Sequence, residues 1–299
     1  MTPAQITRLI TETLGETPLS VTPLTFGHSS ISYDVTLPGR SLIVRTNADP
    51  AVFFGTAHNF TVLRGLGLPV PKLIAQDLTK EHYLAAYMLL TKIPGRDLRY
   101  ELGTMTSAQK RRLAEQIVSY QRDVATLPSG DGFGYVPIGK VAPFTTWRDL
   151  VLAEIGKDLP EKLEPPLTRW HERVFALTDV FAPYLKQVRL TCFLDNLTTK
   201  NIIVQNGELS GLIDFDVVCY GDPLWTLGLT AAAIVLEIGP EQLDYVEDLC
   251  RAYGLGEMER AVVAWYAALF SLTFLVKSSD EETSRLHNAL RKWIEPLEN

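Results

Sequence analysis

The segment from Leu190 to Pro223, LTCFLDNLTTKNIIVQNGELSGLIDFDVVCYGDP, constrains the fold more than any other part of the chain. Its apolar residues at 202–204 are separated from those at 209, 212 and 213 by Asn206-Gly207, a pair that accepts the positive φ angles of a tight hairpin turn. The segment therefore predicts two adjacent antiparallel strands. Such a hairpin brings the residues before its first strand close to those after its second strand.

Polar side chains stand at these two ends of the predicted hairpin. Asn196 and Asn201 precede the first strand, and Asp214 follows the second. Amide and carboxylate oxygens suit Mg²⁺ when the ion shares its coordination shell with phosphate oxygens. The five-residue step from Asn196 to Asn201 is also the spacing between base and metal ligand in a kinase catalytic loop, where the first residue is an aspartate. We therefore predict that Asn201 and Asp214 hold Mg²⁺, with an amide, Asn196, in the base position.

The segment resembles the catalytic segment of the aminoglycoside phosphotransferase-like family, which has the protein-kinase-like fold. In that family a His-Gly-Asp-x-x-x-x-Asn loop leads into a hairpin, followed by Ile-Asp-Phe or Ile-Asp-Trp and then Gly-Asp-Pro. The chain matches at Asn201, at Ile213-Asp214-Phe215 and at Gly221-Asp222-Pro223, and departs at Leu194-Asp195-Asn196. The resemblance implies an α+β, bilobal fold with a small antiparallel β-sheet in the N-lobe and a mainly helical C-lobe.

The pattern of elements along the chain fits this organisation. Apolar and polar residues alternate over 31–37, and a Pro38-Gly39 turn separates them from a second predicted strand over 42–46, which together predict a β-hairpin. Further apolar residues over 83–90 predict another strand. Capping boxes at 2–5 and 106–109 predict the starts of helices, and helical spacing recurs over 56–66 and through most of the chain after residue 223. The resemblance implies a nucleotide-binding lobe over 1–93 and a helical lobe over 94–299, which holds the hairpin and an acceptor pocket.

The resemblance also implies the nucleotide contacts. The loop before the first strand of the 31–46 hairpin would cover the phosphates with backbone and hydroxyl donors. Arg45, at the end of the second strand, would face the α- and β-phosphates, which a guanidinium can bind through two hydrogen bonds. The residues of the phosphate loop are Gly27, His28, Ser29 and Ser30. The family's helical Glu that pairs with this cation aligns with Asn59, an amide in place of a carboxylate.

Two further sets of contacts are expected from the same resemblance. Thr91, Lys92 and Ile93 correspond to the hinge, whose backbone groups pair with the purine edge. The acceptor pocket is built in this family by the helices after the metal-binding aspartate, which makes Asp216 and Glu237 candidate acidic contacts.

Composition restricts the partners. The net charge of −7 and the pI near 5.3 argue against nucleic acid or an anionic membrane as a partner, because either favours a basic surface. Three cysteines without metal-type spacing fit reduced thiols, and the N-terminus has no basic region followed by an apolar run. We therefore expect a cytoplasmic protein that acts on a small molecule. The oligomeric state stays open.

The expected function is transfer of the γ-phosphoryl group of ATP or GTP to the hydroxyl group of a small molecule, with Mg²⁺ as cofactor. Three accounts of Asn196 compete: Asp195 acts as the base from the neighbouring position, Asn196 is an inactivating replacement for Asp, or the chain is a nucleotide-binding pseudokinase. The alternative function is a sensor module that binds a nucleotide without turnover. The choice between ATP and GTP also stays open.

Overall fold

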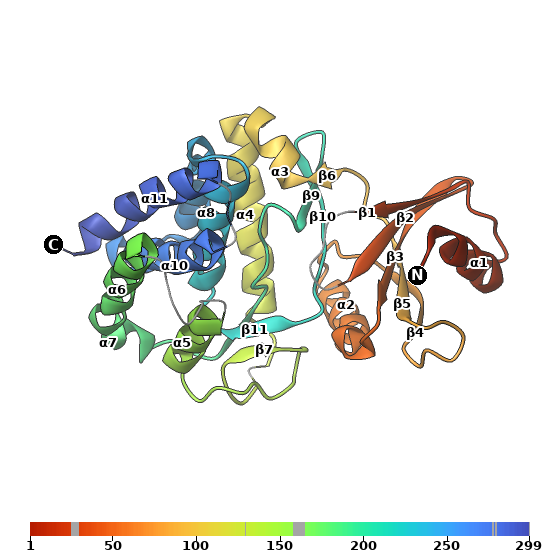
Figure 1. Cartoon of the computed structure of the whole chain (residues 1–299), viewed down its shortest axis with the longest axis horizontal. Coiled ribbons are helices and arrows are strands. Elements are labelled where there is room, and N and C mark those ends of the chain that lie inside the picture. Colours follow the sequence, from red (N-terminus) through yellow and green to blue (C-terminus); the bar gives the residue numbers. More distant parts are fainter. Residues whose placement is uncertain (25–29, 129, 158–164, 277, 279, 299) are drawn as a thin grey trace. The chain divides into compact units, whose positions relative to one another are not determined.

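The computed structural model describes residues 1–24, 30–128, 130–157, 165–276, 278 and 280–298 (Figure 1). Three residues of the expected phosphate loop, Gly27, His28 and Ser29, lie outside these ranges. The chain divides into two compact units. The first comprises Met1–Pro94 and Ser210–Val217, and the second comprises Gly95–Leu209 and Val218–Asn299.

The first unit is built on a five-stranded antiparallel sheet with the strand order β1-β2-β3-β5-β4. Its strands are β1 (Ser20–Leu24), β2 (Ile31–Leu37), β3 (Arg40–Asn47), β4 (Leu73–Asp77) and β5 (Ala86–Thr91). The predicted hairpin over 31–46 is β2 and β3, and its alternation puts Tyr33, Val35 and Leu37 in the core, whereas Ile31 at the start of β2 is exposed. The predicted strand over 83–90 begins later, at Ala86, and β1 and β4 were missed.

Short helical elements flank this sheet. They are α1 (Pro3–Leu14), the 3-10 helix η1 (Pro50–Phe53) and α2 (Thr56–Gly65). The capping box of Thr2 and Gln5 is confirmed, and α1 buries Ile6, Leu9 and Ile10 in a cluster with residues of β2, β3 and β5. Phe53 of η1 packs in a separate cluster with other residues of β5. Strand β3, which carries Arg45, pairs with β2 and β5, and its residues Leu42 and Val44 pack in the cluster with α1.

The hairpin after residue 201 is confirmed. Strands β9 (Ile202–Gln205) and β10 (Glu208–Leu212) are joined by Asn206 and Gly207, with φ angles of 55° and 76°. In the same sheet β9 also pairs with β6 (Arg96–Asp97). The chain after Leu209 was expected to belong to the helical lobe, but residues 210–217 pack with the first unit. The N–H of Leu212 donates to the carbonyl oxygen of Pro69 at 2.9 Å, which ties the end of β10 to that unit.

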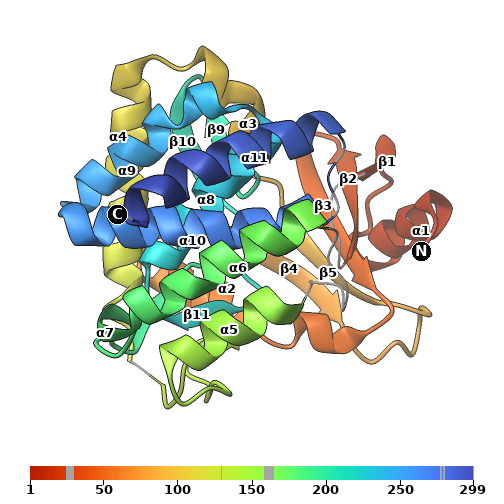
Figure 2. The ribbon, with the colours of Figure 1, turned by 60° about the vertical axis from the view of Figure 1, so that its left-hand side comes forward.

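The second unit is mainly helical. Its helices are α3 (Leu98–Glu101), α4 (Ser107–Val124), α5 (Trp147–Lys157), α6 (Pro165–Val180), α7 (Ala182–Leu185), α8 (Leu224–Glu237), α9 (Asp244–Tyr253), α10 (Glu257–Leu275) and α11 (Asp280–Ile294), with short 3-10 helices at Leu102–Thr104, Pro240–Gln242 and Glu295–Leu297. The capping box of Thr106 and Gln109 at the start of α4 is confirmed. Helix α10 packs against α8, α6 and α11 (Figure 2).

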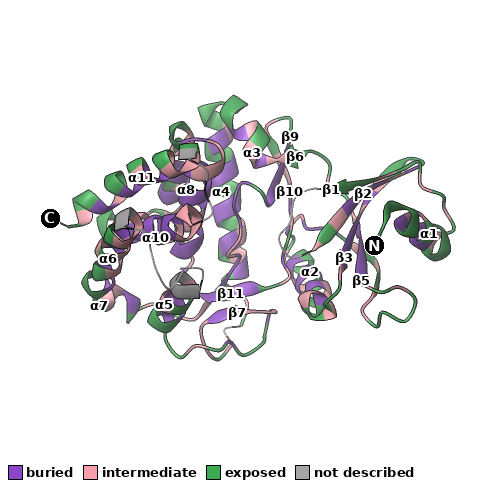
Figure 3. Ribbon diagram, in the orientation of Figure 1, coloured by how far each residue is buried: buried purple, intermediate pink, exposed green. Residues whose placement is uncertain are grey.

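Helices α8 and α10 form the centre of this unit, and buried residues run along both (Figure 3). They approach closely at Gly228, where a Cβ atom would lie 2.4 Å from Cβ of Tyr266. Helix α10 is also long and apolar enough to span a membrane by length and composition, and half of its apolar window is buried inside the protein. The packing identifies it as a core helix.

A small sheet lies beside these helices and was not predicted. It has the order β7-β11-β8, with β7 at Gly134–Val136, β8 at Thr191–Phe193 and β11 at Val218–Gly221. Strands of three or four residues are too short to show a periodic pattern, so only their partners along the sheet reveal them.

Candidate active site

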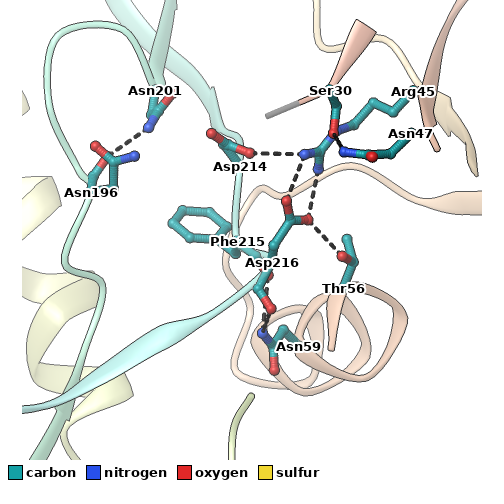
Figure 4. Close-up of polar contacts among 10 residues, drawn as sticks. All are labelled: Ser30, Arg45, Asn47, Thr56, Asn59, Asn196, Asn201, Asp214, Phe215 and Asp216. Carbon is teal, nitrogen blue, oxygen red and sulfur yellow. Dashed lines mark hydrogen bonds and ion pairs between the residues drawn. The ribbon is translucent and has the colours of Figure 1, made fainter. Parts of the chain in front are cut away.

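The first unit contains a buried, positively charged side chain, Arg45. Arg45 of β3 is only 8% exposed, and its guanidinium group lies 5.3 Å from the ring centre of Phe53. Its two terminal nitrogens donate to the two carboxylate oxygens of Asp216 at 2.7 and 2.6 Å (Figure 4). Burial lowers the pKa of Arg45, but the charges of Asp216 and Asp214 more than offset this, so its pKa is raised. The group is a permanent positive charge.

Asp214 is the second acidic neighbour of this cation. Its Oδ1 atom lies 3.3 Å from a guanidinium nitrogen of Arg45, and 45% of its side chain is exposed. Its backbone has a φ angle of 71°, a left-handed conformation that is uncommon for a residue with a side chain. Neighbouring protein atoms displace water from the carboxyl group and Asp216 repels its charge; together these raise the pKa of Asp214 against the opposing effect of Arg45.

Helix α2 holds the backbone that carries these acidic residues. Asn59 of α2 is completely buried, and its amide nitrogen donates to the carbonyl oxygens of Phe215 and Asp216, both at 3.0 Å. Thr56 donates its hydroxyl to Oδ1 of Asp216 at 2.6 Å. The carboxylate that neutralises Arg45 therefore comes from the chain after β10. Sequence reasoning treated Asp216 as an acceptor contact and gave no signal for this ion pair.

The loop over 194–201 lies in the second unit and is fixed by side chains of two helices. Gln121 of α4 is 3% exposed; its amide nitrogen donates to the carbonyl oxygen of Leu194 at 2.8 Å, and its amide oxygen accepts from the N–H of Leu194 at 2.9 Å. Thr226 of α8 donates to the same carbonyl at 3.0 Å. Sequence reasoning missed Gln121 and Thr226, because each lies far along the chain from the loop.

Within this loop, the predicted pair Asn196 and Asn201 is in direct contact. The amide nitrogen of Asn201 donates to the backbone carbonyl oxygen of Asn196 at 2.8 Å (Figure 4). This contact uses the nitrogen of the amide and leaves its oxygen as an electron-pair donor. Asn201 is 7% exposed, and Asn196 is half-buried.

Asp195 lies beside the small sheet of the second unit. Burial raises the pKa of Tyr135 and of Cys219, and the negative charge of Asp195 adds to both shifts. Burial and the charge of Asp195 also raise the pKa of Cys192 to about 12, against the opposing effect of a hydrogen bond to Tyr220. Asp195 therefore lies close enough to Tyr135 of β7, Cys192 of β8 and Cys219 of β11 for its charge to act on them.

The sequence profile of the phosphotransferase enzyme family matches residues 20–266. The chain belongs to this family. No curated protein sequence matches the chain.

Solved structures of aminoglycoside phosphotransferases have the same fold. Aminoglycoside phosphotransferase APH(4)-Ia is 16% identical, with a TM-score of 0.74 over 97% of this chain and 99% of that one. The GDP complex of aminoglycoside 2'-phosphotransferase-IIIa is 14% identical, with a TM-score of 0.72 over 99% of this chain and 100% of that one. These similarities confirm the expected fold: an antiparallel sheet in the N-terminal part and a mainly helical C-terminal part.

The family motif Gly-Asp-Pro has a structural role in this member. Asp222 is 4% exposed, and its carboxylate accepts from the hydroxyl groups of Tyr184 and Tyr266, both at 2.9 Å, and from the N–H of Leu224 at 3.0 Å. Burial raises the pKa of Asp222 against these three donors. Trp147 in turn donates its indole N–H to Tyr266 at 2.8 Å. This chain of hydrogen bonds fixes the start of α8, the helix that carries Thr226.

The expected hinge residues lie at the end of β5 in the first unit. The N–H of Thr91 donates to the carbonyl oxygen of Lys72 at 2.9 Å, and the N–H of Lys92 donates to that of Ser41 at 3.3 Å. The side chain of Lys92 forms an ion pair with Asp34. Two of the backbone donors in this segment are thus already bonded within the protein.

The remaining predicted residues lie apart from these groups. The hydroxyl of Ser30 accepts from the amide nitrogen of Asn47 at 3.3 Å, in the first unit. Glu237, at the end of α8, forms an ion pair with Lys200 and lies 4.0 Å from Arg99 in the second unit. Its carboxylate is 13% exposed and faces cations of the protein itself.

Proposed function

We propose that this member of the phosphotransferase enzyme family is a small-molecule kinase, which transfers the γ-phosphoryl group of ATP or GTP to a substrate hydroxyl. The observation that carries the proposal is the pairing of a buried cation, Arg45, with Asp214, an aspartate that remains 45% exposed and has a left-handed backbone. A permanent charge beside an accessible carboxylate suits the recognition of a phosphate-bound metal ion.

Mg²⁺ would be held by Asp214 and Asn201. The donor set fits this ion, because Asp214 offers an accessible carboxylate and Asn201 an amide oxygen whose nitrogen is already engaged. Across the described ranges, no group of three His, Cys, Asp or Glu side chains is arranged to bind a metal. Phosphate oxygens and water would therefore complete the shell. When bound, the ion would neutralise negative charge on the transferring group.

The nucleotide would be held by the first unit. Arg45 would contact its phosphates, together with Ser30 and the neighbouring residues Gly27, His28 and Ser29. In the hinge of Thr91, Lys92 and Ile93, the N–H groups of the first two already have protein acceptors, which supports Ile93 as the donor to a purine. The second unit would hold the acceptor, with Glu237 at the end of α8 as a candidate contact.

Asn196 and Asp195 would act on the acceptor hydroxyl. An asparagine side chain can hydrogen-bond a hydroxyl group but does not take up its proton at neutral pH. Asn196 would therefore contribute by orientation, which is a large part of catalysis in phosphoryl transfer. Asp195 supplies a carboxylate one residue earlier and is the other candidate for the base.

The free thiols of the chain support the cellular location that we propose for this kinase. Cys192, Cys219 and Cys250 are all buried and unpaired with one another. Free thiols in a protein core fit a reducing compartment. A cytoplasmic location and a small-molecule substrate, without nucleic acid or membrane as partner, remain our proposal.

A second candidate function is nucleotide binding without turnover. One observation favours it: the base position carries the amide of Asn196, which does not take up the proton of a hydroxyl group. Such a chain would bind a nucleotide as a sensor.

The test measures nucleotide binding and Mg²⁺-dependent turnover of ATP and GTP with a panel of hydroxylated acceptors. Hygromycin B and kanamycin belong in the panel, because structurally similar aminoglycoside phosphotransferases were solved in complex with them. The unmodified chain is compared with Asn196→Asp and Asp214→Ala. If the chain is a kinase, Asn196→Asp should raise turnover at least about tenfold, a gain of about 1.4 kcal/mol in transition-state stabilisation, and Asp214→Ala should abolish it. Nucleotide binding without turnover in any variant would favour the sensor.

A further inference from the structure

The strongest unexplained contact in the first unit joins Arg45 to Asp216. A buried guanidinium group needs a counter-charge, because loss of one partner of a buried pair leaves a desolvated charge. Asp216 meets this need with two parallel hydrogen bonds of 2.7 and 2.6 Å, the strongest geometry available to an arginine and a carboxylate. Asp214, at 3.3 Å, is the weaker partner.

Helix α2 cannot supply this counter-charge. Its ten residues, TAHNFTVLRG, include no Asp or Glu. The two buried polar residues of α2, Thr56 and Asn59, instead bond the carboxylate and the carbonyl oxygen of Asp216. The helix therefore contacts the cation through Asp216, which lies 171 positions after Arg45 in the sequence.

The exposure of the two aspartates separates their roles. The side chain of Asp216 is 18% exposed, whereas that of Asp214 is 45% exposed. Asp216 has its two oxygens occupied by Arg45 and one of them also by Thr56. Asp214 keeps an accessible carboxylate. An aspartate whose oxygens are both engaged inside the protein is poorly suited to contact an acceptor.

We propose that Asp216 is a positioning residue for Arg45: it replaces the carboxylate that α2 lacks, couples α2 to the cation, and leaves Asp214 free for the metal ion. This inference builds on the proposed function, because it assigns Arg45 to the phosphates. It also replaces the expected acceptor contact of Asp216 by a role in the nucleotide-binding half of the site.

The first experiment measures binding of Mg²⁺ with ADP or GDP by calorimetry. Asp216→Asn keeps the size of the side chain and removes its charge, Asp216→Glu keeps the charge, and Glu16→Gln removes a carboxylate from an exposed pair with Arg40 in the same unit. We expect Asp216→Asn to weaken nucleotide binding at least tenfold, Asp216→Glu to recover part of the loss, and Glu16→Gln to change it less than twofold. Equal or tighter binding by Asp216→Asn would overturn the proposal, because Asp216 would then compete with the phosphates.

A second readout does not need a nucleotide. Modification of Arg45 by phenylglyoxal is followed by mass spectrometry of the Arg45 peptide, with circular dichroism to verify folding. We expect Asp216→Asn to speed this modification at least fivefold and Asp214→Asn to change it less than twofold. If no variant binds nucleotide, the proposed function has failed, and a selective rise in Arg45 reactivity would still support Asp216 as the residue that holds the cation. Equal reactivity in both variants would contradict it.

Discussion

The hydrogen bonds to Leu194 allow a quantitative test of how the loop over 194–201 is held. The carbonyl oxygen of Leu194 accepts from both Gln121 and Thr226, whereas its N–H donates to Gln121 alone. Gln121→Met removes both bonds of the amide at similar side-chain length. Thr226→Val removes one hydroxyl at nearly constant shape.

The expected loss of unfolding free energy depends on which backbone group of Leu194 loses its last hydrogen-bond partner. Thr226→Val leaves the carbonyl bonded to Gln121 and should cost about 0.5–1.5 kcal/mol of unfolding free energy. Gln121→Met leaves the N–H of Leu194 buried without a partner and should cost about 1–3 kcal/mol. The double variant also leaves the carbonyl unpaired, so its cost should exceed the sum of the two by about 1–2 kcal/mol.

Urea unfolding followed by tryptophan fluorescence measures this cycle in the relevant unit. All five tryptophans of the chain lie in the second unit, at Trp147, Trp170, Trp225, Trp265 and Trp293. A matched control is Thr273→Val on α10, whose hydroxyl donates to the carbonyl oxygen of Phe270 in the same helix. Combined with Gln121→Met, this control should give additive costs.

Additivity of Gln121→Met and Thr226→Val within about 0.3 kcal/mol, the usual result for independent sites, would refute the reasoning. It would mean that the two side chains do not share the Leu194 carbonyl as their acceptor. A coupling confined to this pair would show that α4 and α8 jointly fix the loop that carries Asn196.

Three further predictions concern the second unit. Tyr266→Phe removes one of three donors from the buried carboxylate of Asp222 and should lower the unfolding free energy, measured by urea unfolding, by about 1–3 kcal/mol. A loss below about 0.5 kcal/mol would contradict a stabilising role of this hydrogen bond. Burial lowers the pKa of His171 and His287 from 6.5, so the unfolded chain binds more protons and stability should fall as the pH drops from 7.5 to 5.5. The melting temperature of the unmodified chain should therefore fall more steeply over this pH range than that of the double variant His171→Gln with His287→Gln. Equal pH dependence of the two melting temperatures would argue against this. Burial raises the pKa of all three cysteines, so the folded protein at pH 8 should react with iodoacetamide at least about tenfold more slowly than the urea-unfolded chain. Mass spectrometry measures the extent of labelling. Rapid labelling of the folded protein would show that the thiols are accessible.

Local patterns in the sequence predicted much of the fold. The turn at Asn206-Gly207 and the capping boxes at Thr2 and Thr106 depend on residues within a few positions of each other, and all three are present as predicted. The alternation over 31–37 likewise determined which face of β2 is buried. The motif residues 213–215 and 221–223 led to the family, which the sequence profile confirms.

The short strands β7, β8 and β11 depend on pairing partners far away in the chain, so no local pattern could reveal them. The same holds for the anchoring of Leu194 by Gln121, 73 positions earlier.

The counter-charge of Arg45 was decided by tertiary structure alone. The sequence determined that an arginine lies near the end of a strand, that α2 lacks an acidic residue, and that two aspartates follow β10. Which of them neutralises the arginine depends on the path of residues 210–217, which pack with the first unit and present Asp216 to Arg45 with both oxygens. A sequence pattern records which charges are available. Their distances and burial, which decide the strength of an ion pair, exist only once the chain has folded.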